Sequence, residues 1–205
     1  NDKSLIRNAF SYELARDWAG QNGGMRTRFV EVFFNQNDGT LDFNDYRGVY
    51  VLTERIERGK DRINVEKLNP LMTDPALITG GYVFSKDKEP RDNPINTLTS
   101  AAWGSQPLDV FEPGKPNAAQ IGYMRDYMNG FEAALTSSSF ADPLTGYAAY
   151  IDPRSFMDWH LIAEVARQVD AFQNSNYFHK PRGERVKALP MWDFNLAWGL
   201  PTGDG

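Results

Sequence analysis

The sequence predicts an α+β fold in which several helices pack beside small antiparallel sheets. Three segments carry apolar residues at steps of three and four, which is typical of amphipathic helices. Short runs rich in β-branched and aromatic residues lie between them, bounded by glycine and other turn residues, as strands are. Over the first sixty residues these patterns follow the order helix, strand, strand.

The first helix is expected over residues 4–19. Asp2 and Ser4, at its start, are residue types that commonly cap helix N-termini. The turn residues 21–24 then end the helix. Four large apolar residues recur at near-helical spacing and define one predicted face: Ile6, Phe10, Leu14 and Trp18.

Three strands are expected next. Segments 28–34 and 48–54 are rich in β-branched and aromatic residues, and the turn-rich stretch between them predicts that they pair as a long hairpin. Charges alternate over 54–67, a pattern typical of a solvated face. A third strand is expected over 80–86, and the polar, proline-rich stretch 88–116 predicts mostly loop.

Two further helices and a small hairpin complete the prediction. Regular apolar spacing favours a helix over 118–135. Asp152 followed by Pro153 predicts an N-cap and the first turn of a helix that continues to about Gln168. Segments 177–180 and 186–189 flank turn residues and predict the hairpin. The buried stripe of the last helix is expected to contain Phe156, Trp159, Ile162, Ala163 and Ala166.

Composition excludes several classes of function. A chain of 205 residues is long enough for one sizeable core, so we expect a single domain over 1–205. The net charge of −5 argues against a nucleic-acid partner, and no apolar run is long enough to predict a membrane span. Because the chain has no cysteine and two histidines, disulfides, thiol nucleophiles and multi-histidine zinc centres are excluded. The absence of cysteine also favours an extracytoplasmic protein.

Two aspartates stand beside large apolar residues. Asp170 follows directly on the last predicted helix, and Asp193 lies 23 residues later in an aromatic segment. A buried isolated carboxylate is costly, so each is expected to be paired, metal-bound or protonated. In phosphoryl-transfer sites an aspartate accepts the proton of the attacking hydroxyl, and an amide and a later aspartate hold a divalent ion.

The chain has residues for these roles in the same order: Asp170, then Asn174 or Asn176, then Asp193. Carboxylate and amide oxygens together with nucleotide phosphates suit magnesium. The alternative is structural, with both acids buried and hydrogen-bonded to backbone amides.

Five sequence blocks make a more specific pattern. They are Asp2–Ala9, Arg28–Asn35, Tyr46–Glu54, Ile78–Tyr82 and Trp192–Ala197. Together, and in this order, they resemble the CotH kinase family of bacterial spore-coat and secreted proteins. The resemblance implies a divergent protein kinase-like fold that binds ATP and magnesium and phosphorylates serine. Similar proteins have a strand before the first block and helices after the last, so this domain is expected to be truncated at both ends.

The resemblance also implies roles for single residues. Asp170 takes the catalytic position and Asp193 the metal-binding position. From the residues themselves, Asn174 or Asn195 is expected to be a further magnesium ligand. Lys86, at the end of the third predicted strand, is then the best cation for the nucleotide.

Glu54 is expected to orient Lys86 as the Glu–Lys pair of kinases does. The alternative for both residues is a solvent-exposed charge, which is the usual state of lysine and glutamate.

We therefore expect an atypical kinase that transfers phosphate from ATP to a serine of a surface or coat protein, outside the cytoplasm. The segment 88–116 would accept the protein substrate. The alternative function is a non-catalytic surface or adhesion module, pseudokinase-like or carbohydrate-associated, that retains the fold. A third hypothesis is a metal-dependent hydrolase that uses both acids.

Overall fold

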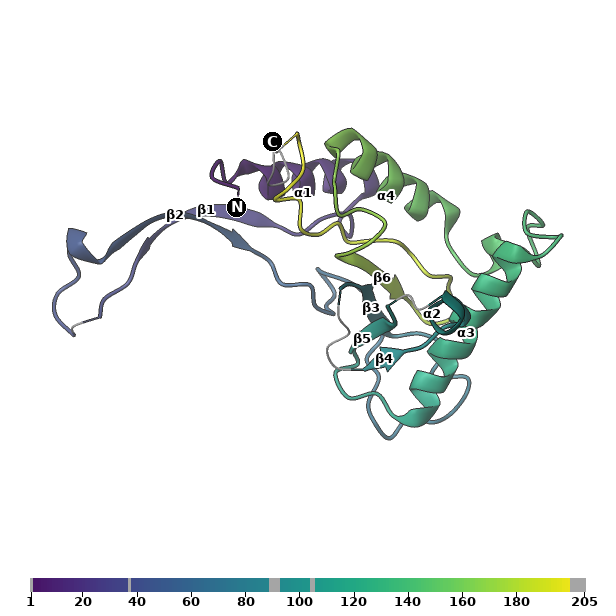
Figure 1. Cartoon of the computed structure of the whole chain (residues 1–205). Helices are drawn as coiled ribbons and strands as arrows, with labels where there is room; N and C mark the ends of the chain where they lie inside the picture. The colour runs from purple at the N-terminus through teal and green to yellow at the C-terminus, as the bar shows by residue number, and fades with distance from the viewer. Residues whose placement is uncertain (1, 37, 89–92, 104–105, 200–205) are drawn as a thin grey trace.

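The computed structural model describes residues 2–36, 38–88, 93–103 and 106–199, in which helices and two small antiparallel sheets confirm the α+β class (Figure 1). Two short 3-10 helices, Phe43–Asp45 and Tyr147–Ala149, accompany them. The main elements are α1 (Ile6–Ala19), β1 (Thr27–Phe33), β2 (Tyr46–Thr53), β3 (Tyr82–Lys86), β4 (Pro94–Ile95), α2 (Leu98–Trp103), β5 (Leu108–Glu112), α3 (Ala118–Thr136), α4 (Pro153–Ala166) and β6 (Asn176–Lys180).

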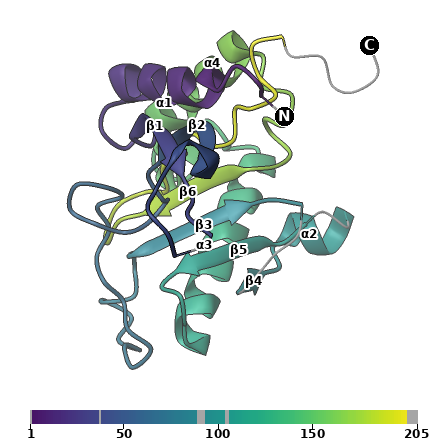
Figure 2. The same ribbon diagram turned by 90° about the vertical axis from the view of Figure 1, so that its left-hand side faces the viewer.

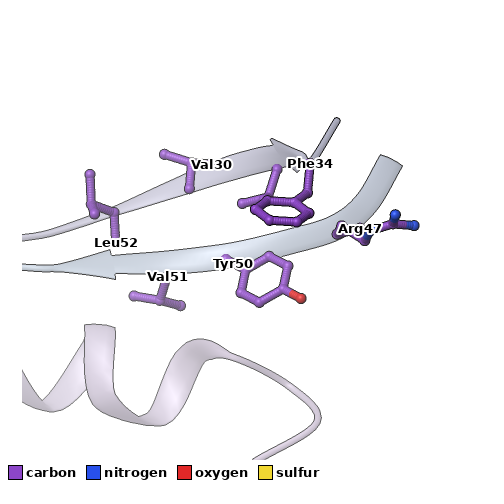
Figure 3. A pocket seen from close by; sticks show the side chains of 7 residues that line it. Val30, Phe34, Arg47, Tyr50, Val51 and Leu52 are labelled. Carbon is purple, nitrogen blue, oxygen red and sulfur yellow. The ribbon is translucent and has the colours of Figure 1, made fainter. Parts of the chain in front are cut away.

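The predicted hairpin is confirmed. Strands β1 and β2 pair antiparallel, from Thr27 opposite Thr53 to Phe33 opposite Tyr46, and the hairpin extends away from the rest of the molecule (Figure 1). Its strands carry apolar side chains that remain exposed, among them Phe29 at 50% and Leu52 at 61%. Figure 3 shows the open hollow, of about 450 Å³, that is lined by Val30, Val32, Phe34, Arg47, Tyr50, Val51 and Leu52.

The second sheet has the strand order β4-β5-β3-β6, with β3 buried at its centre. The third predicted strand is thus confirmed, whereas the prediction of mostly loop over 88–116 is wrong. Strand β4, helix α2 and strand β5 occupy much of that segment, and residues 89–92 and 104–105 lie outside the described part. Strand β5 forms because its backbone pairs with β3, about 25 residues earlier, a contact that local composition does not reveal.

Helix α1 is present, but its predicted apolar face is wrong. The buried residues are Ser11, Tyr12 and Ala15, whereas Ile6 and Phe10 are 56% and 54% exposed. Tertiary packing determines which face of α1 is buried. The helix packs against α4 and against the segment after Leu189, where Tyr12 contacts aromatic rings.

The predicted N-caps of α1 are also wrong. Leu5, in a left-handed conformation with φ 62°, precedes the helix without a side-chain cap. The carboxylate of Asp2 instead accepts hydrogen bonds from the backbone N–H groups of Ser4 at 3.0 Å and Arg7 at 3.2 Å.

Helices α3 and α4 confirm their predictions. The Asp152 side chain accepts hydrogen bonds from the N–H groups of Arg154 and Ser155, at 3.0 and 3.3 Å, and Pro153 occupies the first turn. Helix α4 ends at Ala166, slightly earlier than expected. Of its predicted stripe, Ile162, Ala163 and Ala166 are buried, while Phe156 and Trp159 pack partly buried against the core.

The small hairpin after α4 is shorter than expected. Strand β6 pairs along its length with β3, and its pairing with the following segment reduces to the two backbone hydrogen bonds between His179 and Lys187. At the end of β6 the buried Lys180 donates to the carbonyls of Thr79 and Glu184 and lies 4.5 Å from the ring centre of Tyr127.

The core forms on two sides of β6. Helices α1 and α4 lie together beyond the β6 edge of the larger sheet, and α3 lies behind that sheet (Figure 2). The segment 189–197 fills the core between α1 and α4. Among the described residues, no helix is long and apolar enough to cross a membrane.

The two ends of the described chain are tied together. Arg7 donates to the carbonyl of Ala197 at 3.0 Å, and Asn8 accepts a hydrogen bond from the N–H of Phe194 at 2.6 Å. One turn later in α1, Ser11 accepts a hydrogen bond from the Trp198 indole at 2.9 Å. Helix α1 therefore holds the segment in which Asp193 lies.

Candidate functional site

The loop after α4 places Asp170 in a tight turn. The Asp170 carbonyl accepts hydrogen bonds from the N–H groups of Gln173 and Asn174, at 3.1 and 3.0 Å. The Asn174 amide therefore folds back toward Asp170, with its Nδ2 3.5 Å from the carboxylate. Lys86 reaches the same loop, where its Nζ donates to the carbonyl of Gln173 at 3.0 Å.

Asp193 lies in a turn that is fixed by side chains from two helical regions. Its backbone is left-handed, with φ 60°. Its N–H donates to the Tyr12 hydroxyl of α1 at 3.0 Å, and its carbonyl accepts a hydrogen bond from the Gln168 side chain just after α4. The Gln168 hydrogen bond thus connects the Asp193 turn directly to the segment that leads into the Asp170 loop.

The acids of this region act on one another electrostatically. Burial raises the pKa of Asp193, and the negative charges of Asp170 and Asp87 raise it further, while the hydrogen bond from Ser175 lowers it. The pKa rises because a buried carboxylate beside other carboxylates is costly to ionise. Sequence reasoning missed Asp87, which follows Lys86 at the end of β3. Its position beside Lys86 is the sequence feature that could have identified it.

Left-handed backbone is concentrated here. Seven non-glycine residues in the described ranges have a positive φ that side chains disfavour, and five of them lie in the last forty residues of those ranges. Such conformations persist where the surrounding structure imposes them, and they cluster at functional sites. The five residues are Arg167, Phe172, Ser175, Asp193 and Trp198.

The expected pairing of Glu54 with Lys86 is wrong. Glu54, at the base of the hairpin, bonds Arg26 at 2.5 Å and Arg62 at 3.0 Å. The hydrogen bond from Arg26 is the main reason that the pKa of Glu54 is lowered. Arg26, just before β1, and Arg62 are nearer partners for Glu54 than Lys86, which binds the Asp170 loop instead.

The two remaining amide candidates lie in different elements. Asn176 is buried at the start of β6, in register with Lys86 of β3. Asn195 is half-buried in the turn that follows Asp193. Among the amides, Asn174 is therefore the one that the structure brings to Asp170.

The donors at this site fit magnesium better than a softer metal. Among the described residues, no group of three or more His, Cys, Asp or Glu is arranged to hold a metal ion. Magnesium is commonly bound by one or two carboxylates with substrate phosphates and water, which matches Asp170, Asp193 and the Asn174 amide. A cation here would also offset the repulsion that raises the pKa of Asp193.

The Tyr12 hydroxyl is expected to stabilise the Asp193 turn. In Tyr12→Phe the N–H of Asp193 loses its acceptor, so the free energy of unfolding is expected to fall by about 1 kcal/mol in urea titrations. The matched control is Tyr50→Phe, because Tyr50 is 49% exposed on the hairpin. Equal losses in both variants would contradict this role.

The comparison with known protein families covers all of these elements. The family model described as CotH kinase protein matches residues 1–204. No curated protein matches the chain. The family match extends from α1 through the hairpin and both sheets to the Asp170 loop and the Asp193 turn, and it confirms the resemblance carried by the five sequence blocks. This chain belongs to the CotH kinase family.

Proposed function

We propose that this protein transfers phosphate from ATP to a serine of a protein acceptor, with magnesium as cofactor. The observation that carries the proposal is the link between two acids 23 residues apart: Gln168, two residues before Asp170, donates a hydrogen bond to the carbonyl of Asp193, and the charge of Asp170 raises the pKa of Asp193. Asn174 and Lys86 contact the same loop. We further propose that residues 1–205 belong to one kinase-like domain.

In this proposal Asp170 accepts the proton of the serine hydroxyl. Asp193, with Asn174 or Asn195, would hold magnesium. The bound ion would supply positive charge to stabilise the negative charge that develops during phosphoryl transfer.

Lys86 is proposed to bind a nucleotide phosphate. An ammonium group has three donors, and the Gln173 carbonyl accepts from Lys86 at 3.0 Å, so donors remain for a phosphate oxygen. The same hydrogen bond would couple phosphate binding to the position of the Asp170 loop.

The acceptor and the place of action are proposed from composition and family. The acceptor is a serine-bearing surface or coat protein, which the segment 88–116 would contact. The protein would act outside the cytoplasm, in a secreted, cell-surface or spore-coat setting, consistent with a sequence that contains no cysteine.

The test incubates the purified protein with magnesium and ATP labelled on the γ-phosphate, with and without a serine-rich acceptor protein. We expect label on serine, in the enzyme itself or in the acceptor, and none when EDTA is present. Release of free phosphate without protein labelling would instead indicate a metal-dependent hydrolase. A melting temperature unchanged by ATP and magnesium would indicate a non-catalytic module, since ligands that bind the native state stabilise it.

A further inference from the structure

We infer that Gln168 is a positioning residue that holds the Asp193 backbone against the Asp170 loop. This inference deepens the proposed function and rests on it for the effect on activity. Its structural part, the fixing of the Asp193 turn by one side chain, can be measured whatever reaction the protein performs.

The backbone of Gln168 is itself well anchored. Helix α4 ends at Ala166, its C-cap Arg167 has a left-handed conformation, and Gln168 follows with its N–H donating to the carbonyl of Ala163 at 3.0 Å. Its carbonyl accepts a hydrogen bond from the N–H of Ala171 at 3.2 Å, within the turn that contains Asp170. The side chain thus projects from the rigid end of a helix.

The Gln168 amide group forms one contact and lacks another. Its Nε2 donates to the carbonyl of Asp193, whereas its Oε1 is buried without a hydrogen-bond partner in the described part of the protein. Gln168 belongs to the lining of a cavity of about 10 Å³, which Asn174, Ser175 and Asn176 also line. This volume is at the lower limit for one water molecule.

An unpaired buried carbonyl oxygen disfavours folding, so stability does not explain why a glutamine stands here. A hydrophobic side chain of the same length would fill the space without an orphaned polar atom. Proteins retain buried polar atoms without hydrogen-bond partners mainly at functional sites. The contact that glutamine supplies and a hydrophobic residue does not is the hydrogen bond to Asp193.

Asp193 needs such a contact because its backbone conformation is unfavourable, with a positive φ of 60°. Tyr12 holds the N–H side of this residue and Gln168 holds the carbonyl side. Without Gln168, we expect the turn to move away from Asp170 and the carboxylate to leave its position opposite the loop.

The test uses Gln168→Met, which keeps the length of the side chain and removes both polar atoms. We expect a melting temperature close to that of the wild type, because the loss of the hydrogen bond to Asp193 is offset by the removal of an unpaired buried acceptor. Backbone amide exchange over residues 191–197 is expected to become about tenfold faster, while exchange in α4 is unchanged. At saturating ATP, kcat is expected to fall about tenfold with KM for ATP unchanged.

The matched control is Gln36→Met, on the exposed connection of the hairpin, which is expected to change none of these quantities. Unchanged exchange over 191–197 in Gln168→Met would overturn the inference. A fall in stability with faster exchange throughout α4 would also overturn it, because the role would then be structural. If the wild type labels no protein, the proposed function fails, and the exchange measurement still decides the role of Gln168.

Discussion

Replacing Asp193 with asparagine is expected to abolish phosphoryl transfer while making the folded protein more stable at neutral pH. Activity is expected to fall by about a thousandfold, equivalent to about 4 kcal/mol, because an amide is a weaker magnesium ligand than a carboxylate. Asparagine tolerates the left-handed backbone found at this position, with φ 60°, so the turn itself is expected to remain. The measurement is the rate of label transfer at several magnesium concentrations.

The expected gain in stability follows from the pKa of Asp193. Burial and the charges of Asp170 and Asp87 raise this pKa above the value of 3.8 for a free side chain. The folded state therefore binds the proton more tightly than the unfolded state. The resulting stabilisation is complete below pH 3.8 and is lost as pH rises through the folded pKa. An uncharged asparagine avoids this loss.

We therefore expect Asp193→Asn to melt at a higher temperature than the wild type at pH 7, with the difference shrinking toward pH 3.5. Magnesium is expected to raise the melting temperature of the wild type more than that of the variant. Asp126→Asn is the control, because Asp126 is exposed on α3. A variant less stable than the wild type at pH 7 would show that the Asp193 carboxylate is a structural acid.

Asp170→Asn is expected to have the second largest effect, a fall of about a thousandfold in kcat, in the range found for loss of a general base. The amide keeps the shape of the side chain and its place beside Asn174 but does not accept the serine proton. Because the Asp193 carboxylate remains, KM for ATP and the magnesium dependence are expected to stay near their wild-type values. Rapid-quench measurement of a single turnover separates this chemical step from product release.

The two aspartate variants test the assignment of roles together. Full activity in Asp170→Asn with no activity in Asp193→Asn would contradict the role proposed for Asp170. A higher magnesium requirement in Asp170→Asn, with kcat unchanged, would make Asp170 a metal ligand. The same Asp126→Asn control applies, since it removes an aspartate charge far from this loop in sequence and on another helix.

Elements with strong local signals were predictable from the sequence. Asp152 and Pro153 determine the start of α4, and regular apolar spacing marks α3, so both helices formed as expected. The buried face of α1 was not predictable, since packing against the distant segment 189–197 selects Tyr12 and Ala15. Strand β5 was missed for a similar reason, as its partner is β3.

The candidate site was predictable only in outline. The order of Asp170, Asn174 and Asp193 follows from the sequence, and the structure brings the first two together and places the third near them. Gln168 was not predictable, because it reaches Asp193 only through a left-handed turn after α4. Glu54 was assigned a partner from kinase analogy, whereas nearby arginines satisfy its charge at the base of the hairpin.

The hydrogen bonds between α1 and the last described residues determine when this part of the protein can fold during synthesis. Tyr12 and Asp193 are separated by 181 positions, so the ribosome makes the acceptor of this hydrogen bond long before its donor. Helix α1 meets its hydrogen-bond partners in this segment only when residues 193–198 have left the exit tunnel. Contacts between distant residues slow folding, and partly made chains expose the surfaces that those contacts later cover. A nascent chain therefore carries α1 without the Asp193 turn until translation of this region is almost finished.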